Sequence, residues 1–117
     1  MINQINVGVI GTGWCGGIRA NACADNPLVD KLYIAETNSN RLKKLKNSLN
    51  IEKATENWQE LVNNKNIDTI IISATPETTH YPMALAALKA GKNVFLEKPI
   101  ATTLKEAEEL IDVSIKN

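Results

Sequence analysis

The strongest constraint on this chain's fold is a glycine-rich segment, Gly11-Thr12-Gly13-Trp14-Cys15-Gly16, which directly follows the apolar run 5–10. The run Ile-Asn-Val-Gly-Val-Ile is typical of a buried strand, and residues 15–26 are predicted to form a helix. A strand, G-x-G-x-x-G and a helix in succession indicate a loop that places a diphosphate on the free amides of a helix N-terminus. Glycine-rich turns without a ligand also occur, so the context decides the weight of the pattern.

The decisive context is an acidic residue, Glu36, directly after the next predicted strand, 31–35. Glu36 lies 20 residues after Gly16, which is the spacing found in dinucleotide-binding folds. Gly11 permits the tight turn, Gly13 lets the backbone approach a pyrophosphate, and Gly16 lets the helix pack closely on the sheet. Glu36 is expected to accept hydrogen bonds from the adenosine ribose and to repel a 2′-phosphate, which favours NAD over NADP. The other motif residues expected beside the cofactor are Thr12, Trp14 and Cys15.

Arg41 bears on the same choice, because it lies five residues after Glu36. It is either a residue that reaches a cofactor phosphate or an exposed member of a basic helix face. That helix is predicted to begin at the N-cap Ser39 and to bury Leu42 and its apolar neighbours at helical spacing.

Strands and helices alternate along the rest of the chain. The clearest strand, 69–74, is apolar without alternation, as expected for a central strand covered on both faces. Right-handed crossovers then predict an α/β fold, a doubly wound parallel sheet of the Rossmann type in three α-β-α layers. The other expected elements are strands at 52–55 and 93–96, helices at 58–63 and from Pro76 to a stop at Gly91, and a last helix capped by Thr103 that buries Leu104, Ala107, Leu110 and Ile111.

Composition and charge limit the kinds of partner that this chain is expected to bind. Thirteen basic and thirteen acidic residues give a formal net charge of zero, so no long-range field favours nucleic acid or an anionic membrane. The apolar runs are far shorter than the roughly 20 residues that span a bilayer. Cys15 and Cys23, on one predicted helix, lie too far apart for a disulfide and form no metal-ligand cluster with the single His80. We expect a cytoplasmic protein without a metal site.

Three further segments carry a family resemblance: Thr75-Pro76-Glu77-Thr78-Thr79-His80, Leu85 to Ala90, and Gly91 to Ala101, within which Ala90 to Pro99 reads A-G-K-x-V-x-x-E-K-P. With the glycine loop, these segments strongly resemble the N-terminal nucleotide-binding domain of the glucose–fructose oxidoreductase / inositol dehydrogenase / rhizopine-catabolism (Gfo/Idh/MocA) family. The resemblance runs from about Ile5 to the last helix.

The resemblance implies an NAD(P)-dependent oxidoreductase that transfers a hydride to or from a sugar, cyclitol or similar polyol. It implies that Lys98 is catalytic and lies near the nicotinamide, where an ammonium can hydrogen-bond the oxygen that gains charge. It also implies that Glu97 holds Lys98 or contacts the cofactor, that Thr75 and Pro76 line the cleft, and that the Lys98–Pro99 bond is cis. We expect His80 to be a packing or capping residue.

Two departures from the family pattern stand out. Arg19 occupies a position where members often have His. The chain of 117 residues is also interpreted as one dinucleotide-binding domain, 1–117, without the family's C-terminal substrate domain, and such a domain is expected to bind NAD(H) and turn over little. The alternatives are a non-enzymatic NAD-sensing or regulatory module and a degenerate structural paralogue that self-associates through apolar surface.

Overall fold

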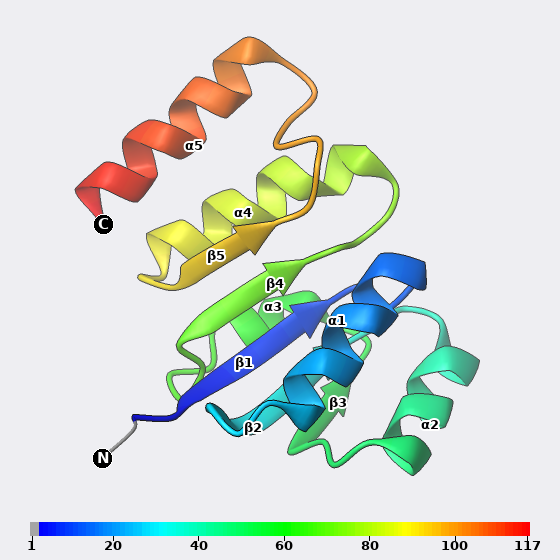
Figure 1. Ribbon diagram of the computed structural model, residues 1–117. Coiled ribbons are helices and arrows are strands. Elements are labelled where there is room, and N and C mark those ends of the chain that lie inside the picture. The colour runs from blue at the N-terminus through cyan, green and yellow to red at the C-terminus, as the bar shows by residue number, and fades with distance from the viewer. Residues whose placement is uncertain (1–2) are drawn as a thin grey trace.

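Five parallel strands form one sheet in the order β3-β2-β1-β4-β5 in the computed structural model, which describes residues 3–117 (Figure 1). The predicted alternation of strands and helices is confirmed, and the central placement of β4 between β1 and β5 is confirmed with it. In chain order the elements are β1 (Ile5–Ile10), α1 (Trp14–Asp25), β2 (Val29–Ala35), α2 (Ser39–Ser48), β3 (Lys53–Thr55), α3 (Trp58–Val62), β4 (Thr69–Ile72), the 3-10 turn η1 (Glu77–Thr79), α4 (His80–Lys89), β5 (Asn93–Leu96) and α5 (Leu104–Lys116).

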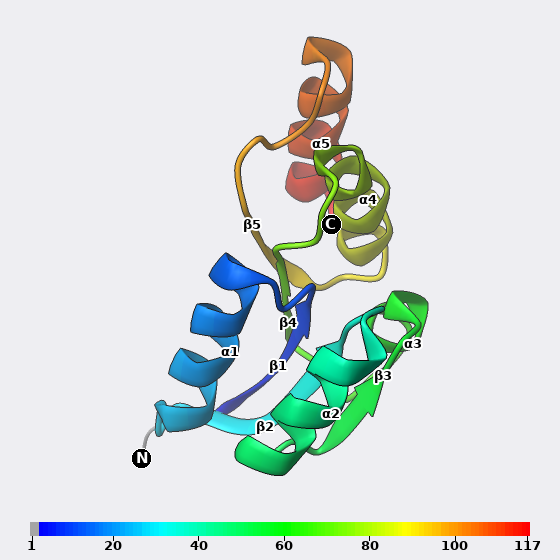
Figure 2. The ribbon, with the colours of Figure 1, turned by 90° about the vertical axis from the view of Figure 1, so that its right-hand side faces the viewer.

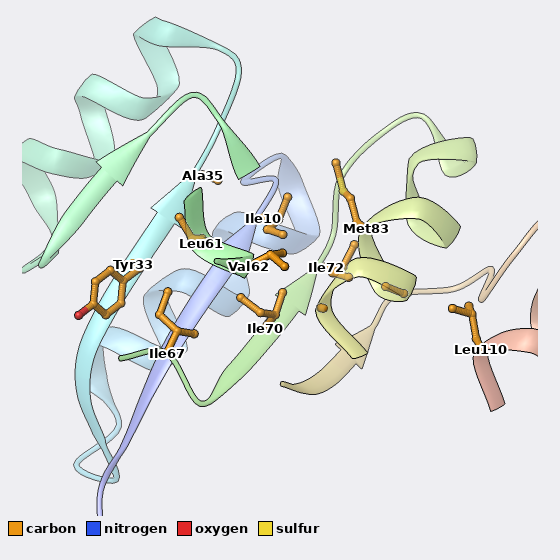
Figure 3. Close-up of a cluster of buried hydrophobic side chains, with 12 residues drawn as sticks. Ile10, Tyr33, Ala35, Leu61, Val62, Ile67, Ile70, Ile72, Met83 and Leu110 are labelled. Atoms are coloured by element: carbon orange, nitrogen blue, oxygen red, sulfur yellow. The ribbon is translucent and has the colours of Figure 1, made fainter. Parts of the chain in front are cut away.

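Helices cover both faces of the sheet, which is the predicted three-layer arrangement (Figure 2). On one face, Val7, Val9 and Ile34 pack toward α1 and α2. On the other, Ile70 and Ile72 belong to a larger cluster with residues of α3, α4 and α5 (Figure 3). Because side chains alternate between the two faces along a strand and both faces of β4 are covered, residues 70–72 of β4 are all isoleucine.

The strand order reverses between β1 and β4, which are neighbours in the sheet although five elements separate them in the chain. The chain leaves β1 toward β2 and leaves β4 toward β5, so the loops after β1 and β4 diverge. In doubly wound sheets this divergence opens a crevice beyond the carboxyl ends of the strands, and ligands bind there. The topology therefore directs attention to residues 11–16, 36–41 and 73–80.

Two helix caps test the sequence reasoning. Thr103 caps α5 as predicted, because its hydroxyl accepts a hydrogen bond from the Glu106 amide at 3.1 Å. The prediction for α2 was wrong by one residue: the side chain of Asn38, not Ser39, accepts a hydrogen bond from the Arg41 amide at 3.0 Å. Both residue types cap helices well, so the preceding backbone path decided between them.

The inward face of α5 was predicted correctly only in part. Leu110 is buried, whereas Leu104 and Ile111 are exposed, and Ile115 extends the exposed apolar side of this helix. The helix lies against α4 beyond the edge strand β5 (Figures 1 and 2), so a narrow stripe suffices to pack it. Within residues 3–117, no helix has both the length and the apolar character needed to cross a membrane.

Candidate cofactor-binding site

The glycine loop between β1 and α1 has the close contacts that its sequence predicts. Gly11 has a φ of 84°, and a Cβ added there would lie 2.5 Å from the Ala74 Cα. A Cβ added at Gly16 would lie 1.8 Å from the Gly11 carbonyl oxygen. Both positions therefore exclude any side chain. The expected close packing at Gly16 is confirmed, although its nearest neighbour is the loop backbone rather than a strand.

Gly13 differs from the other two motif glycines, because the space above it is open. The nearest atom to an added Cβ is the Arg41 Nη1, 3.9 Å away. Gly13 is also the N-cap of α1 and supplies no side-chain hydrogen bond to the first turn of the helix. The start of α1 thus has no side-chain cap and leaves open space at the Cβ position of Gly13, as a bound diphosphate requires.

A cavity of about 450 Å³ opens at the crevice and joins segments far apart in the sequence. Of the predicted cofactor residues, it is lined by Gly11, Thr12, Gly13, Glu36, Arg41 and Thr75. The loops after β1, β2 and β4 supply these residues, so the cavity extends from the expected ribose site at β2 across the point where the strand order reverses. Its volume lies within the range of small-molecule and cofactor sites.

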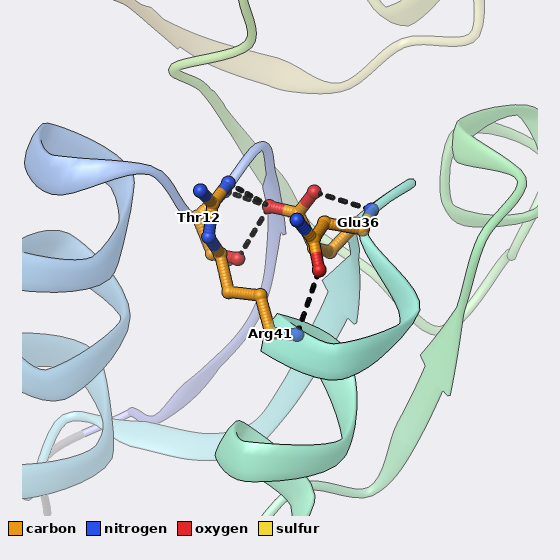
Figure 4. Close-up of polar contacts among 4 residues, drawn as sticks. Thr12, Glu36 and Arg41 are labelled. Atoms are coloured by element: carbon orange, nitrogen blue, oxygen red, sulfur yellow. Dashed lines mark hydrogen bonds and ion pairs between the residues drawn. The ribbon is translucent and has the colours of Figure 1, made fainter.

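The carboxylate of Glu36 accepts several hydrogen bonds from the residues around the cavity, and Glu36 is almost fully buried. Its Oε1 accepts hydrogen bonds from the Thr12 amide at 2.8 Å and the Thr12 hydroxyl at 2.6 Å, while its Oε2 accepts from the Asn38 amide at 2.9 Å (Figure 4). The carboxylate therefore connects the glycine loop to the start of α2. Because a carboxylate oxygen accepts about two hydrogen bonds, Oε2 retains one acceptor site.

Burial by itself would raise the pKa of the Glu36 carboxyl. The hydrogen bonds from Thr12, Asn38 and Arg41 outweigh it, and the pKa is lowered from its ordinary value. Glu36 is therefore ionised at neutral pH although it is buried. An ionised carboxylate with one free acceptor site can bind a hydroxyl donor and repels a phosphate.

Arg41 is not simply a residue of a basic helix face. Its Nη1 lies 3.3 Å from the Glu36 Oε1, and the side chain lines the cavity while remaining nearly half exposed. Arg41 is thus both an exposed residue of α2 and part of the cavity lining, so its role toward a cofactor phosphate stays a prediction. The pairing also occupies part of the guanidinium with Glu36.

The remaining predicted site residues lie outside the cavity lining: Trp14, Cys15, Gly16, Pro76, Glu97 and Lys98. Trp14 and Cys15 are exposed on the first turn of α1. The cis Lys98–Pro99 bond implied by the resemblance is present, and the Thr75–Pro76 bond is cis as well.

Lys98 is exposed, in the segment that follows β5. Its neighbour Glu97 accepts a hydrogen bond from the Arg19 Nε at 3.0 Å and forms an ion pair with the same guanidinium, which also stacks over Phe95 with its Cζ 4.8 Å from the ring centroid. The ion pairs among residues 3–117 are Arg19–Glu97, Arg41–Glu36 and Lys53–Glu60, so Lys98 takes part in none of them.

Sequence reasoning missed several residues that line the cavity. Ser73 follows β4 and is buried, and its hydroxyl is the buried side-chain polar atom without a partner in residues 3–117. A polar residue directly after a strand of isoleucines was a signal that went unused. The other missed lining residues include Asn38, Trp58, Thr79 and Met83, which reach the crevice only through the packing of α2, α3 and α4. Among the described residues, no three His, Cys, Asp or Glu side chains gather as metal ligands do.

Residues 5–117 match the model of a family described as "Oxidoreductase family, NAD-binding Rossmann fold". The chain belongs to this family. The myo-inositol 2-dehydrogenase of Thermotoga maritima is 32% identical over 96% of this chain, and an NADP⁺-dependent scyllo-inositol 2-dehydrogenase of Bacillus subtilis is 28% identical over 93%. The scyllo-inositol dehydrogenase of Lactobacillus casei, solved with NAD(H) and scyllo-inositol, superposes with a TM-score of 0.88 at 28% identity, covering 97% of this chain and 34% of that one.

These comparisons confirm the Rossmann fold and the family resemblance. This member of the oxidoreductase family spans about a third of the length of the relatives that it matches, 33% of the Thermotoga protein and 30% of the Bacillus one. It is homologous to the nucleotide-binding region of inositol dehydrogenases. The relatives include proteins named for NAD⁺ and for NADP⁺, so family membership alone does not select between the two.

Proposed function

We propose that this chain binds NAD(H) in the cavity at the carboxyl edge of the sheet and serves as the nucleotide-binding part of an oxidoreductase that acts on a sugar, cyclitol or similar polyol. The observation that carries the proposal is that one cavity is lined both by Gly13, where the space at the Cβ position is open, and by the buried, ionised Glu36. The polyol class is supported by the inositol dehydrogenases among the relatives.

Different residues of the cavity bind different parts of the dinucleotide. The amides at the start of α1 stabilise the diphosphate charge, because the helix dipole and the unpaired N–H groups both favour an anion there. Glu36 accepts a hydrogen bond from a ribose hydroxyl through Oε2. Ser73, with a buried hydroxyl that lacks a partner, is a further donor beside the glycine loop.

NAD is proposed over NADP for an electrostatic reason. A 2′-phosphate at the ribose site would meet the Glu36 carboxylate, and Arg41, the nearest cation, is already paired with that carboxylate. With a formal net charge of zero, the chain supplies no long-range positive field to offset the repulsion.

Lys98 is the proposed catalytic residue. Bound NAD supplies the hydride chemistry, and the protein must stabilise the substrate oxygen whose charge changes during the transfer. An exposed ammonium at the carboxyl edge, not paired with Glu97 beside it, is available for that hydrogen bond. Such a group has no role in a module that only senses NAD, so its presence favours the enzymatic interpretation.

The proposal has two further parts, on location and self-association. The proposed location is the cytoplasm, a reducing compartment in which an exposed thiol such as that of Cys15 stays reduced. Self-association is supported by the exposed apolar side chains of α5, Leu104, Ile111 and Ile115.

The test is a calorimetric titration of the purified chain with NADH and with NADPH, repeated with the variant Gly13→Ala. We expect NADH to bind, NADPH to bind about tenfold or more weakly, and the variant to lose affinity for both. A folded sample that binds neither nucleotide would refute the cofactor assignment. Equal affinity for the two would leave the site in place and refute the role of Glu36.

A further inference from the structure

His80, the first residue of α4, connects the two loops that leave the neighbouring strands β4 and β5. Its Nε2 lies 2.9 Å from the Ala74 carbonyl oxygen, and its Nδ1 lies 2.8 Å from the Pro99 carbonyl oxygen. The side chain is only 3% exposed. A carbonyl oxygen only accepts, so a neutral imidazole donates to one of the two carbonyls and an imidazolium donates to both. In either form His80 supplies a donor that an apolar residue of the same size lacks, which is a more specific role than filling space.

The bond to Pro99 matters because Lys98 is the preceding residue. On the other side of Lys98, the Glu97 amide donates to the Ile72 carbonyl at 3.0 Å, and the Glu97 carboxylate is held by Arg19. Both neighbours of Lys98 are therefore attached to the core, one through Arg19 and β4 and the other through His80. The backbone of Lys98 is fixed at two adjacent points while its side chain is exposed.

We propose that His80 is a positioning residue for Lys98, acting through the Pro99 carbonyl and touching neither substrate nor cofactor. The reason is entropic: a loop residue with both flanking peptides anchored loses backbone freedom before any ligand binds, so its side chain samples fewer directions. The inference rests on the proposed function, since the position of Lys98 matters only if the nicotinamide end of the dinucleotide lies beside it.

The two nitrogens of His80 can be tested separately with amide side chains. The Asn amide nitrogen lies near the position of Nδ1 and can still reach Pro99, whereas the Gln amide nitrogen lies near Nε2 and can still reach Ala74. His80→Asn and His80→Gln thus form a matched pair that keeps one bond each. If His80 acts through Pro99, only His80→Gln should disturb Lys98.

The first measurement is the affinity of the chain for NADH and for ADP, the latter a probe of the adenosine and diphosphate part of the site. We expect His80→Gln to weaken NADH binding about fivefold, the equivalent of one hydrogen bond, and to leave ADP binding unchanged. His80→Asn should retain NADH affinity within about twofold.

The second measurement is a double-mutant cycle with Lys98→Met, which removes the charge and keeps the length of the side chain. If His80 acts through Lys98, the effect of His80→Gln on NADH affinity disappears in the Lys98→Met background. ¹⁵N relaxation should in addition show greater mobility of the Lys98 amide in His80→Gln than in His80→Asn.

The outcomes separate the inference from the proposed function. A wild-type chain that binds neither NADH nor ADP refutes the proposed function, and the inference with it. A chain that binds both, but shows additive effects of His80→Gln and Lys98→Met, equal loss of ADP and NADH affinity, or no effect of Lys98→Met, keeps the cofactor site and refutes the positioning role.

Discussion

Gly13 and Gly16 belong to one motif, yet the structure predicts opposite consequences when each is replaced by alanine. A Cβ at residue 16 would lie 1.8 Å from the Gly11 carbonyl oxygen, where real Cβ atoms stay at 3.0 Å or more, so α1 and the loop must move apart by roughly an ångström. A Cβ at residue 13 meets no atom closer than 3.9 Å. Gly16→Ala should therefore damage the fold, and Gly13→Ala should damage only the ligand site.

The magnitudes follow from these contacts. Overpacking costs about 1–3 kcal/mol, and the upper end applies to Gly16→Ala because the obstructing atom is backbone. Alanine recovers about 1 kcal/mol of helix propensity, which leaves a loss of about 2 kcal/mol, or a fall of about 8 °C in Tm. For Gly13→Ala, the weaker N-cap costs about 1 kcal/mol and the reduced entropy of the unfolded chain returns about 0.4–1 kcal/mol, so the Tm changes little.

The assay combines thermal unfolding with NADH titration at a temperature where each variant is folded. Gly13→Ala should keep its Tm within about 2 °C and lose about tenfold or more in NADH affinity, because its methyl group occupies the diphosphate cradle. The matched control is Gly91→Ala, at a φ of 78° with no atom within 4 Å, which should lose stability and keep NADH affinity. The reasoning is refuted if Gly13→Ala melts as early as Gly16→Ala, or if it binds NADH as tightly as the wild type.

Three further predictions concern the polar groups around Glu36. Glu36→Ser should raise NADPH affinity relative to NADH by about tenfold, because it removes the repelling charge and releases Arg41, and the additional change Arg41→Ala should cancel the gain in a calorimetric comparison. Since the folded-state pKa of Glu36 is lowered, its ionisation stabilises the protein above the unfolded-state pKa of about 4.5, and this contribution is lost as the pH falls through the folded-state pKa. In urea titrations, the difference in unfolding free energy between wild type and Glu36→Gln should therefore shrink as the pH falls through that window. A difference that stays constant would contradict this account. Asn38→Ala should cost about 1 kcal/mol of unfolding free energy through loss of the α2 cap while Ser39→Ala costs less than half as much, and equal losses in denaturant titrations would argue against the observed cap.

The sequence predicted those parts of the protein whose physics is local. Gly11 needs a positive φ, Thr103 caps the helix that begins at the next residue, and the run of isoleucines in β4 indicates burial on both faces. Each of these properties depends on a few neighbouring residues, so it can be read without knowledge of the fold. The same locality produced the errors, since Asn38 and Ser39 are equivalent caps until the backbone path after Glu36 is known.

The family motif carried the prediction further than periodicity did. The segment that ends in Lys98 and Pro99 pointed to the correct family and placed these residues after a strand, as observed. Nothing in the motif indicated which neighbours would hold it. Trp14, Cys15 and Lys98 were expected beside the cofactor, and the structure leaves them exposed, outside the lining of the cavity. Their role at the site remains a prediction that the titrations above address.

By itself, then, the sequence determined the order of strands and helices, the glycine turn and the family. Only the tertiary structure decided which distant residues meet: the pairing of Arg19 with Glu97, the turn of Arg41 toward Glu36, and the bridge from His80 to Pro99. The physical reason is that dihedral preferences and hydrophobic periodicity act over a few residues, whereas these contacts form when parallel strands bring the ends of separate loops to one edge of the sheet. The cavity exists only where those loops converge.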